Sequence, residues 1–279
     1  MKKENKYGAQ LRERVNQDKI LPMIGVYDAF SSLLVADKFD AIFCSGYGFS
    51  ASYYGLPDEG FITWTDMVAY VQRVRAILKD THIIVDIDDG YNDHAIVEVV
   101  TKRLEQVGAS GIILEDQRRP KKCGHLIGKN VLSIDEYKKR LQAVINTKND
   151  IFVIARTDSD DFDDAIKRVN DYSSIGADAI LIEGLRSREQ IIAIKKKIPN
   201  DAKLVVNLIA DGKTESIGLS ELSDLGVSIV NYSTPCLFAA HSAIRESLED
   251  LIENDGKLSS SGNNVTLEDN NSFLKKSSE

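Results

Sequence analysis

Eight short apolar runs, each followed by a stretch with helical spacing, set the strongest limit on what this chain can fold into. Continuous apolar runs of this length are typical of parallel strands that are buried on both faces. Because the order is strand then helix throughout, the chain is predicted to be a (β/α)8 barrel, with a six-stranded open sheet as the alternative. The runs are LPMIGVYD, AIFCSG, HIIVDID, GIILED, IFVIARTD, AILIEG, KLVVNLI and VSIVNYS, and the expected helices lie near 28–38, 65–79, 93–107, 134–147, 161–175, 187–197, 217–225 and 236–253.

The length of 279 residues fits one barrel domain with a large apolar core. We therefore expect a catalytic barrel over residues 1–254. From residue 255 onward the sequence becomes rich in Ser and Asn and poor in apolar residues. This composition predicts that residues 255–279 form a polar, mobile tail with at most a short final helix.

The charge balance limits the classes of partner. Lys and Arg total 35 against 43 for Asp and Glu, so the net charge of −8 argues against a nucleic acid or an anionic membrane as partner. A small anion remains compatible, because a pocket can be basic on an acidic protein. The first residues lack the apolar core of a signal peptide, and no run approaches the roughly 20 residues that span a bilayer. We expect a soluble, cytoplasmic protein.

The three cysteines do not form a disulfide framework or a C-x-x-C pair for zinc. Cys44 and Cys236 lie in apolar sequence and are expected to be buried as small hydrophobic residues. Cys123 differs, because it stands in KKCGH beside cations, which favour the thiolate over the thiol. Cys123 is the candidate reactive cysteine.

Carboxylates dominate the ends of the predicted strands. In a barrel of this type the chemistry lies at the carboxyl ends of the strands. Asp86 and Asp88 are two apart and point the same way, while Glu115 and Asp116 end the next strand. This cluster predicts a hard-cation site for Mg²⁺, with Mn²⁺ as a substitute. The alternative is that these residues cap the following helices.

Two other strand ends carry residues suited to an anion. Ser45, Gly46 and Tyr47 begin an S-G-x-G turn, where backbone N–H groups can approach a carboxylate closely. Arg156 would be costly if it were buried alone, so it should meet either the nearby carboxylates or an anionic substrate. We favour the substrate.

The segment 118–130, RRPKKCGHLIGKN, is a long loop after the fourth predicted strand, with five cations and two glycines. The glycines at 124 and 128 suit a lid that closes over an anion and excludes water. A solvated basic loop is the alternative. That reading accounts for the charges but leaves Cys123 beside His125 without a role.

In this combination the motifs resemble the isocitrate lyase and phosphoenolpyruvate mutase superfamily over roughly residues 8–250. The resemblance implies a Mg²⁺-dependent barrel, usually a tetramer, that forms or breaks C–C or P–C bonds in α-keto or 2-hydroxy carboxylates. The motifs that carry it are YDAFS (27–31), SGYG (45–48), GLPDEG (55–60), VDIDDGY (85–91), LEDQ (114–117), PKKCGHLIGK (120–129), ARTD (155–158), IEG (182–184) and VNLIADGKT (206–214).

The resemblance also implies roles for individual residues. It gives Cys123 the part of catalytic acid or base, together with His125 on a gating loop. The catalytic set that it implies is Cys123, His125, Arg156 and Glu183. The substrate-binding set is Ser45, Gly46, Tyr47, Asp58, Lys122, Gly124 and Asn207, and the metal set is Asp86, Asp88, Glu115 and Asp116.

The loop chemistry favours the lyase branch, because phosphoenolpyruvate mutases carry an E-D-K-x-x-x-K-x-N-S type loop where this chain has Gln117 and Cys123. We expect a Mg²⁺-dependent carbon–carbon lyase that cleaves a 2-hydroxy di- or tricarboxylate, of the 2-methylisocitrate or dimethylmalate type, to a 2-oxo acid and a carboxylate. A homo-oligomer, dimer or tetramer, is expected.

Some positions depart from the usual methylisocitrate lyase pattern. They are Tyr47, Ile87, Asp89 and the segment NYSTP at 231–235, and they border the predicted pocket. The resemblance to carboxyphosphonoenolpyruvate mutase, which has a K-x-C-G-H loop, keeps phosphonate P–C mutase or hydrolase chemistry open. An oxaloacetate hydrolase or decarboxylase on the same scaffold is a further alternative, and a catalytically silent barrel is the last.

Overall fold

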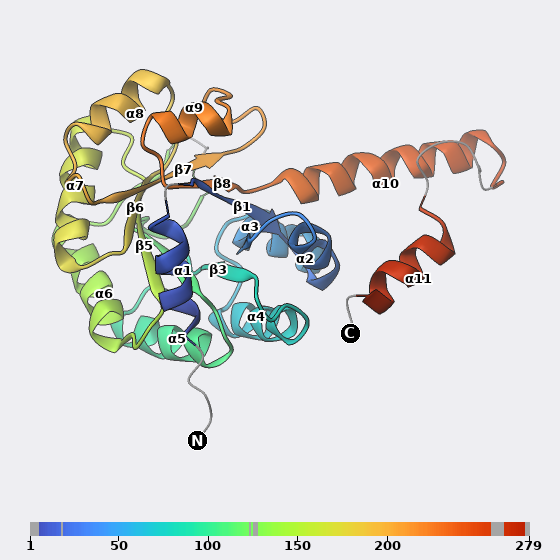
Figure 1. The fold of residues 1–279 in the computed structure, drawn as a ribbon, viewed down its shortest axis with the longest axis horizontal. Helices are drawn as coiled ribbons and strands as arrows, with labels where there is room; N and C mark the ends of the chain where they lie inside the picture. The colour runs from blue at the N-terminus through green and yellow to red at the C-terminus, as the bar shows by residue number, and fades with distance from the viewer. Residues whose placement is uncertain (1–5, 18, 123, 125–127, 258–264, 277–279) are drawn as a thin grey trace.

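The strands close into a barrel. The computed structural model describes residues 6–17, 19–122, 124, 128–257 and 265–276. Eight parallel strands follow one another around the barrel in chain order, and the last pairs with the first (Figure 1). The predicted (β/α)8 fold is therefore confirmed. The strands are β1 Leu21–Val26, β2 Ala41–Cys44, β3 His82–Asp86, β4 Gly111–Glu115, β5 Phe152–Thr157, β6 Ala179–Ile182, β7 Lys203–Leu208 and β8 Ile229–Tyr232.

Each expected helix is present, with shifted ends. Capping explains where several of them begin: the side chains of Thr63, Ser133 and Asp161 accept a hydrogen bond from the backbone N–H three residues later. The helices after the strands are α2 Ala29–Ala36, α4 Trp64–Ile77, α5 His94–Gln106, α6 Ile134–Thr147, α7 Phe162–Ile175, α8 Arg188–Lys195, α9 Leu219–Asp224 and α10 Pro235–Glu253. Four further helical elements were not predicted individually: α1 Tyr7–Val15, α3 Gly46–Phe49, the π-helix η1 Ser50–Tyr54, and α11 Leu267–Lys276.

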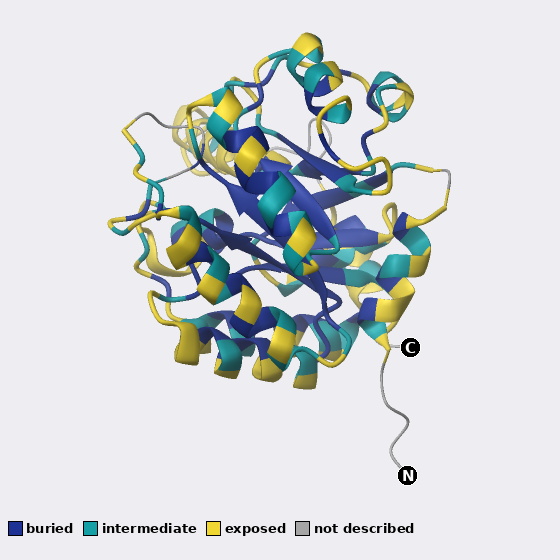
Figure 2. Ribbon diagram, turned by 90° about the vertical axis from the view of Figure 1, so that its left-hand side faces the viewer, coloured by how far each residue is buried: buried dark blue, intermediate teal, exposed yellow. Residues whose placement is uncertain are grey.

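The strands are buried on both faces, as their sequences predict (Figure 2). One apolar cluster fills the inside of the barrel and includes Met23, Phe43 and Ile113, while the outward side chains pack under the helices. Leu11 of α1 belongs to the inner cluster, so α1 closes the amino-terminal end of the barrel. Cys44 is buried as expected, whereas Cys236 is half-buried.

An ion-pair cluster fastens α1 to the amino-terminal ends of β5 and β6. Arg12 donates to both carboxylate oxygens of Asp178, at 2.6 and 3.0 Å, and to the carbonyl oxygens of Asp150 and Ile151. Lys148 and the backbone N–H of Val153 also donate to Asp178, each at 2.8 Å. The carboxylate of Asp178 is therefore fully used in holding this end together.

The C-terminal helices lie outside the barrel. Helix α10 starts at the mouth, projects away from the barrel and has no buried residue (Figure 1). It matches the helix expected from the sequence at 236–253. Helix α11 falls inside the segment expected to be a polar tail, and its Phe273 packs edge-on against Phe30 of α2. No helix in the described part of the chain is long and apolar enough to cross a membrane.

Candidate active site

The residues expected to form the site meet in a cavity at the carboxyl ends of the strands. This cavity, of about 440 Å³, opens at the mouth of the barrel. The barrel interior supplies its apolar floor through Phe43, Ile113 and Leu181. The cavity brings together eight residues expected from the sequence to form the site: Ser45, Tyr47, Asp58, Asp86, Gly124, Arg156, Glu183 and Asn207.

One side of the mouth is built from carboxylates around a lysine. Lys121 Nζ lies 3.1 Å from Asp58 and 3.8 Å from Asp86, and it also contacts Asp88. The carboxylate of Asp86 accepts the backbone N–H of Asp88 at 3.2 Å. Burial raises the pKa of Asp86, although the charge of Lys121 opposes the shift. Buried, interacting carboxylates with a shifted pKa are typical of functional sites.

Backbone geometry on this side is unusual. Asp88 has a φ of +48°, a left-handed conformation that residues with a side chain seldom adopt. Gly46 passes so close to Asp86 that a Cβ atom there would lie 2.8 Å from a carboxylate oxygen. A side chain at position 46 would therefore require the carboxylate of Asp86 to shift, so this turn does approach the site closely.

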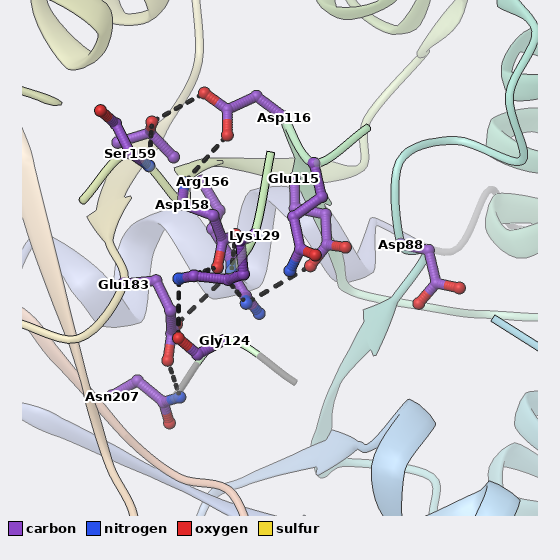
Figure 3. Close-up of polar contacts among 12 residues, drawn as sticks. Asp88, Glu115, Asp116, Gly124, Lys129, Arg156, Asp158, Ser159, Glu183 and Asn207 are labelled. Atoms are coloured by element: carbon purple, nitrogen blue, oxygen red, sulfur yellow. Dashed lines mark hydrogen bonds and ion pairs between the residues drawn. The ribbon is translucent and has the colours of Figure 1, made fainter. Parts of the chain in front are cut away.

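Glu115 ends β4 and lies between Arg156 and Asp88 (Figure 3). Its side chain is 1% exposed, and neither carboxylate oxygen accepts a hydrogen bond from a described residue. Burial raises the pKa of Glu115 well above its ordinary value, against the charges of Lys121 and Arg156. The nearest partner in an ion pair is Arg156, with 3.4 Å between Nη2 and Oε2. A buried carboxylate in this state lacks partners that a cation or ordered water would provide.

The carboxylates on this side could hold a Mg²⁺ ion. Among the described residues, no three His, Cys, Asp or Glu side chains gather closely enough to hold an ion by themselves. Mg²⁺ commonly takes only one or two carboxylates directly and keeps waters and substrate oxygens for the rest. The carboxylates of Asp86, Asp88 and Glu115, with the unsatisfied oxygens of Glu115, are a donor set of that kind.

Asp116 does not join this cluster, which corrects its expected place in the metal set. It follows Glu115 directly, so its side chain points to the other side of the chain, away from Asp88 (Figure 3). Its carboxylate accepts hydrogen bonds from Thr157 Oγ1 at 2.7 Å and from the backbone N–H of Asp158 at 2.9 Å. Tyr172 and Arg168 donate to it as well, at 2.8 and 3.2 Å. Asp116 therefore ties β4 to β5 and α7.

The opposite side of the mouth is an ion-pair network around Arg156. Its Nε and Nη2 donate to the two oxygens of Asp158, at 2.8 and 2.9 Å, and its Nε lies 3.4 Å from Glu183. Of the two fates expected for Arg156, the structure shows pairing with nearby carboxylates, because Asp158 lies two residues along the same strand. Arg156 also lines the cavity.

Amide side chains continue this wall. Asn207 Nδ2 donates to Glu183 at 2.8 Å, and Asn207 Oδ1 accepts from Asn231 at 3.1 Å and from Ser233. Asn231 Oδ1 is buried and accepts no hydrogen bond within the described structure. At the rim, the ring of Tyr47 packs edge-on against Phe238 of α10, with 6.3 Å between centroids. The departures noted at Tyr47 and in the segment 231–235 therefore do border the cavity.

The remaining predicted site residues, four on the loop 118–130 and Ser45 after β2, differ in where the structure places them. Cys123 and His125 lie outside the described residues. Gly124 lines the cavity, as expected. Lys122 does not line it in the described structure, and its backbone forms two hydrogen bonds with the side chain of Gln117. Ser45 lines the cavity, but its hydroxyl accepts the backbone N–H of Gly48 as the cap of α3.

Some residues of the site were missed in the sequence. Lys121, Lys129 and Asp158 all make ion pairs at the mouth, yet none was assigned to the site. Asp158 was detectable, because it stands two residues after Arg156 at the end of a strand. The lysines were not, since loop geometry decides which cation reaches a carboxylate.

Comparison with known proteins agrees with this geometry. Residues 11–252 match the family model described as phosphoenolpyruvate phosphomutase. The chain is 34% identical to 2,3-dimethylmalate lyase of Eubacterium barkeri, over 85% of this chain and 83% of the relative. It is also 34% identical to the chloroplastic carboxyvinyl-carboxyphosphonate phosphorylmutase of Arabidopsis thaliana, over 93% and 79%.

A solved structure of similar shape is oxaloacetate acetylhydrolase in complex with the inhibitor 3,3-difluorooxalacetate. The TM-score is 0.92 at 30% identity, with 99% of this chain and 96% of the other covered. Family model, relatives and fold thus point to one group of enzymes. The chain belongs to the isocitrate lyase and phosphoenolpyruvate mutase superfamily and is a lyase or mutase of that group.

Proposed function

We propose that the chain is a Mg²⁺-dependent carbon–carbon lyase. Its substrate is a 2-hydroxy di- or tricarboxylate of the 2-methylisocitrate or dimethylmalate type, cleaved to a 2-oxo acid and a carboxylate. The observation that carries this proposal is Glu115, a buried carboxylate without hydrogen bonds in the described structure, next to Asp86 and Asp88 at the mouth. Relatives with lyase names at about one-third identity support the same reaction class.

Asp86, Asp88 and Glu115 would hold the metal, which we infer to be Mg²⁺ or Mn²⁺. When bound, the ion supplies a positive charge that stabilises developing negative charge on substrate oxygens. Glu183 and Asn207 form a hydrogen-bonded wall on the opposite side of the cavity, next to Arg156. That wall orients the carboxylate end of the substrate together with Ser45, Gly46 and Tyr47.

Bond cleavage needs two proton transfers. A base removes the proton of the 2-hydroxyl group, the C–C bond breaks, and its electron pair goes to the departing carboxylate fragment. The carbon of that fragment must then receive a proton. We assign this step to the thiol of Cys123, whose neighbour Gly124 lines the cavity, with His125 and Lys122 favouring the thiolate in the reverse direction.

The test is a panel of 2-hydroxy di- and tricarboxylates, with release of 2-oxo acid followed by a coupled assay. We expect wild type to turn over at least one compound with Mg²⁺ and to lose turnover with a chelator. Cys123→Ser should lower kcat by about 10²- to 10⁴-fold, the range of general acid–base catalysis. Equal activity of Cys123→Ser and wild type would remove Cys123 from the mechanism.

A second candidate is phosphonate or oxaloacetate chemistry at the same cavity. It is favoured by likeness to a carboxyvinyl-carboxyphosphonate phosphorylmutase and to an oxaloacetate acetylhydrolase. Phosphorus NMR with phosphonopyruvate tests the first, and release of acetate and oxalate from oxaloacetate tests the second. Turnover of either compound above that of every hydroxy acid would replace the lyase proposal.

We further infer a homo-oligomer, dimer or tetramer, formed through α10. Ile244, Leu248 and Ile252 recur every four residues and form one exposed apolar stripe, with exposed fractions of 61%, 55% and 81%. A second copy of the chain is the partner that we propose, because α10 projects from its own barrel and cannot be covered by it (Figure 1). Light scattering should give a multiple of 31.0 kDa, and Leu248→Glu should lower it.

A further inference from the structure

Asp158 is a buried carboxylate on which two cations converge. Its side chain is fully buried, with an exposed fraction of 0%, at the end of β5. Arg156 donates to both of its oxygens, and Lys129 Nζ donates to Oδ1 at 2.9 Å. Figure 3 shows these three side chains meeting in one place, apart from Asp88 on the metal side. One carboxylate thus holds a strand residue and a loop residue at once.

Lys129 also forms a hydrogen bond within the loop. Its side chain is 1% exposed, and the same Nζ atom donates to the carbonyl oxygen of Gly124 at 2.7 Å. A lysine buried to this degree is stable as a cation only when its N–H groups meet acceptors. Asp158 and Gly124 supply two of them. The lysine therefore links the wall of the barrel to the backbone of the loop.

Gly124 is pressed against the reacting wall by this link. A Cβ atom at Gly124 would lie 2.3 Å from Nη2 of Arg156 and 2.4 Å from Cγ of Glu183. These separations are far below any tolerable contact, so the loop backbone, and no side chain, fits against these two residues. Gly124 therefore lies directly against Arg156 and Glu183, and Lys129 donates a hydrogen bond to it there.

Hydrogen bonds also hold the backbone of Asp158 in place. The backbone N–H of Asp158 donates to Asp116 at 2.9 Å, and Asp116 is held in turn by Thr157, Tyr172 and Arg168. The base of the loop is also fixed, because Arg118 N–H donates to the carbonyl of Asn130 at 2.8 Å. Lys129 therefore connects two parts of the chain that other hydrogen bonds already hold in place. Its removal should loosen only the loop segment between them.

We propose that Asp158 and Lys129 are positioning residues for the reaction, which hold Arg156 and the backbone of Gly124 at fixed places on the cavity wall. Neither acts on the substrate. Lys129 thus connects the position of the Arg156 side chain to the position of the loop. For its kinetic readout this inference rests on the proposed lyase function.

The test compares Lys129→Met with Arg118→Met, a matched removal of a cation from the same loop. Arg118 pairs with Glu136 at an exposed position outside the cavity. We expect Lys129→Met to lower kcat about 10- to 100-fold, the usual cost of losing a group that orients a reacting one, with KM changed less than threefold. Arg118→Met should keep wild-type kcat. Lys129→Arg, which retains the charge, should keep more activity than Lys129→Met.

A second readout does not depend on the reaction. Hydrogen exchange of peptides covering 116–132 should be faster in Lys129→Met than in Arg118→Met, with unchanged exchange and thermal stability elsewhere. If wild type turns over no compound of the panel, the lyase proposal fails while exchange still decides this one. Exchange identical in the two variants, a kcat within threefold of wild type, or a loss of kcat explained by general unfolding overturns the positioning role.

Discussion

At the two ends of the barrel, the pKa of a buried carboxylate is shifted in opposite directions. At the amino-terminal end, burial alone would raise the pKa of Asp178, but hydrogen bonds from Arg12 and Lys148 hold it below its ordinary value. At the mouth, burial dominates, and the pKa of Glu115 lies well above its ordinary value despite two nearby cations. Asp178 is fully hydrogen-bonded, whereas Glu115 accepts no hydrogen bond from a described residue.

This difference separates stability from function. The cluster around Asp178 satisfies every group that it buries, as a structural site does. The mouth retains carboxylates whose charged forms are disfavoured, and a cation or substrate bound there relieves that cost. The predictions below test this division, from the largest effect to the smallest.

Asp86→Asn should produce the largest change. The substitution keeps the shape of the side chain and removes a charge from the metal side. We expect kcat/KM to fall about 10³-fold, since a charged contact to a catalytic ion is lost, and Mg²⁺ affinity by calorimetry to fall with it. The melting temperature should not drop, because burial already disfavours the charge of Asp86. A lower melting temperature with unchanged kcat/KM would show that Asp86 serves stability and not the reaction, contrary to the division drawn above.

The barrel and its mouth were predictable from the sequence to different degrees. Strand order followed from the eight apolar runs. The meeting of Asp86 and Asp88 at Lys121 did not follow from strand spacing, because β3 ends at Asp86 and Asp88 lies beyond it in a left-handed conformation. Asp116 was misassigned because adjacent residues at a strand end face opposite sides, which the motif alone does not express. The role of Lys129 could not be predicted from the sequence, because its partner Asp158 is 29 residues away and the path of the loop decides the contact.

Asp178→Asn should give the next largest effect, and at the opposite end. It removes the negative charge between Arg12 and Lys148 and leaves two partly buried cations facing each other. We expect a loss of about 2–3 kcal/mol of stability, typical of hydrogen bonds to charged groups, measured as a lower melting temperature. Turnover per folded enzyme should stay within twofold of wild type. A matching loss of kcat would show that the ends are not independent.

Acid should reduce the difference in melting temperature between the same two proteins. The pKa of Asp178 is lowered on folding, so its ionised form contributes stability that is present above the unfolded value of about 4. That contribution is lost as the pH falls through the lower, folded value. The difference in melting temperature between wild type and Asp178→Asn should therefore be constant above about pH 5 and shrink toward pH 3. A difference that grows in acid would contradict the assigned pKa shift.

Phe238→Leu should give the smallest change and should be confined to the mouth. Phe238 packs edge-on against Tyr47 at the rim of the cavity and is 38% exposed, so the fold loses little when the ring is removed. An aromatic pair of this kind contributes about 0.5–1.5 kcal/mol. We expect KM to rise about 2- to 10-fold with kcat unchanged, because Tyr47 would lose its support while the metal side and the Asp158 network stay intact. Steady-state kinetics on the best substrate of the panel measures this, and Ile244→Leu on the outer stripe of α10 is the matched control. A fall in kcat with constant KM would instead place Phe238 among the groups that act in the transition state.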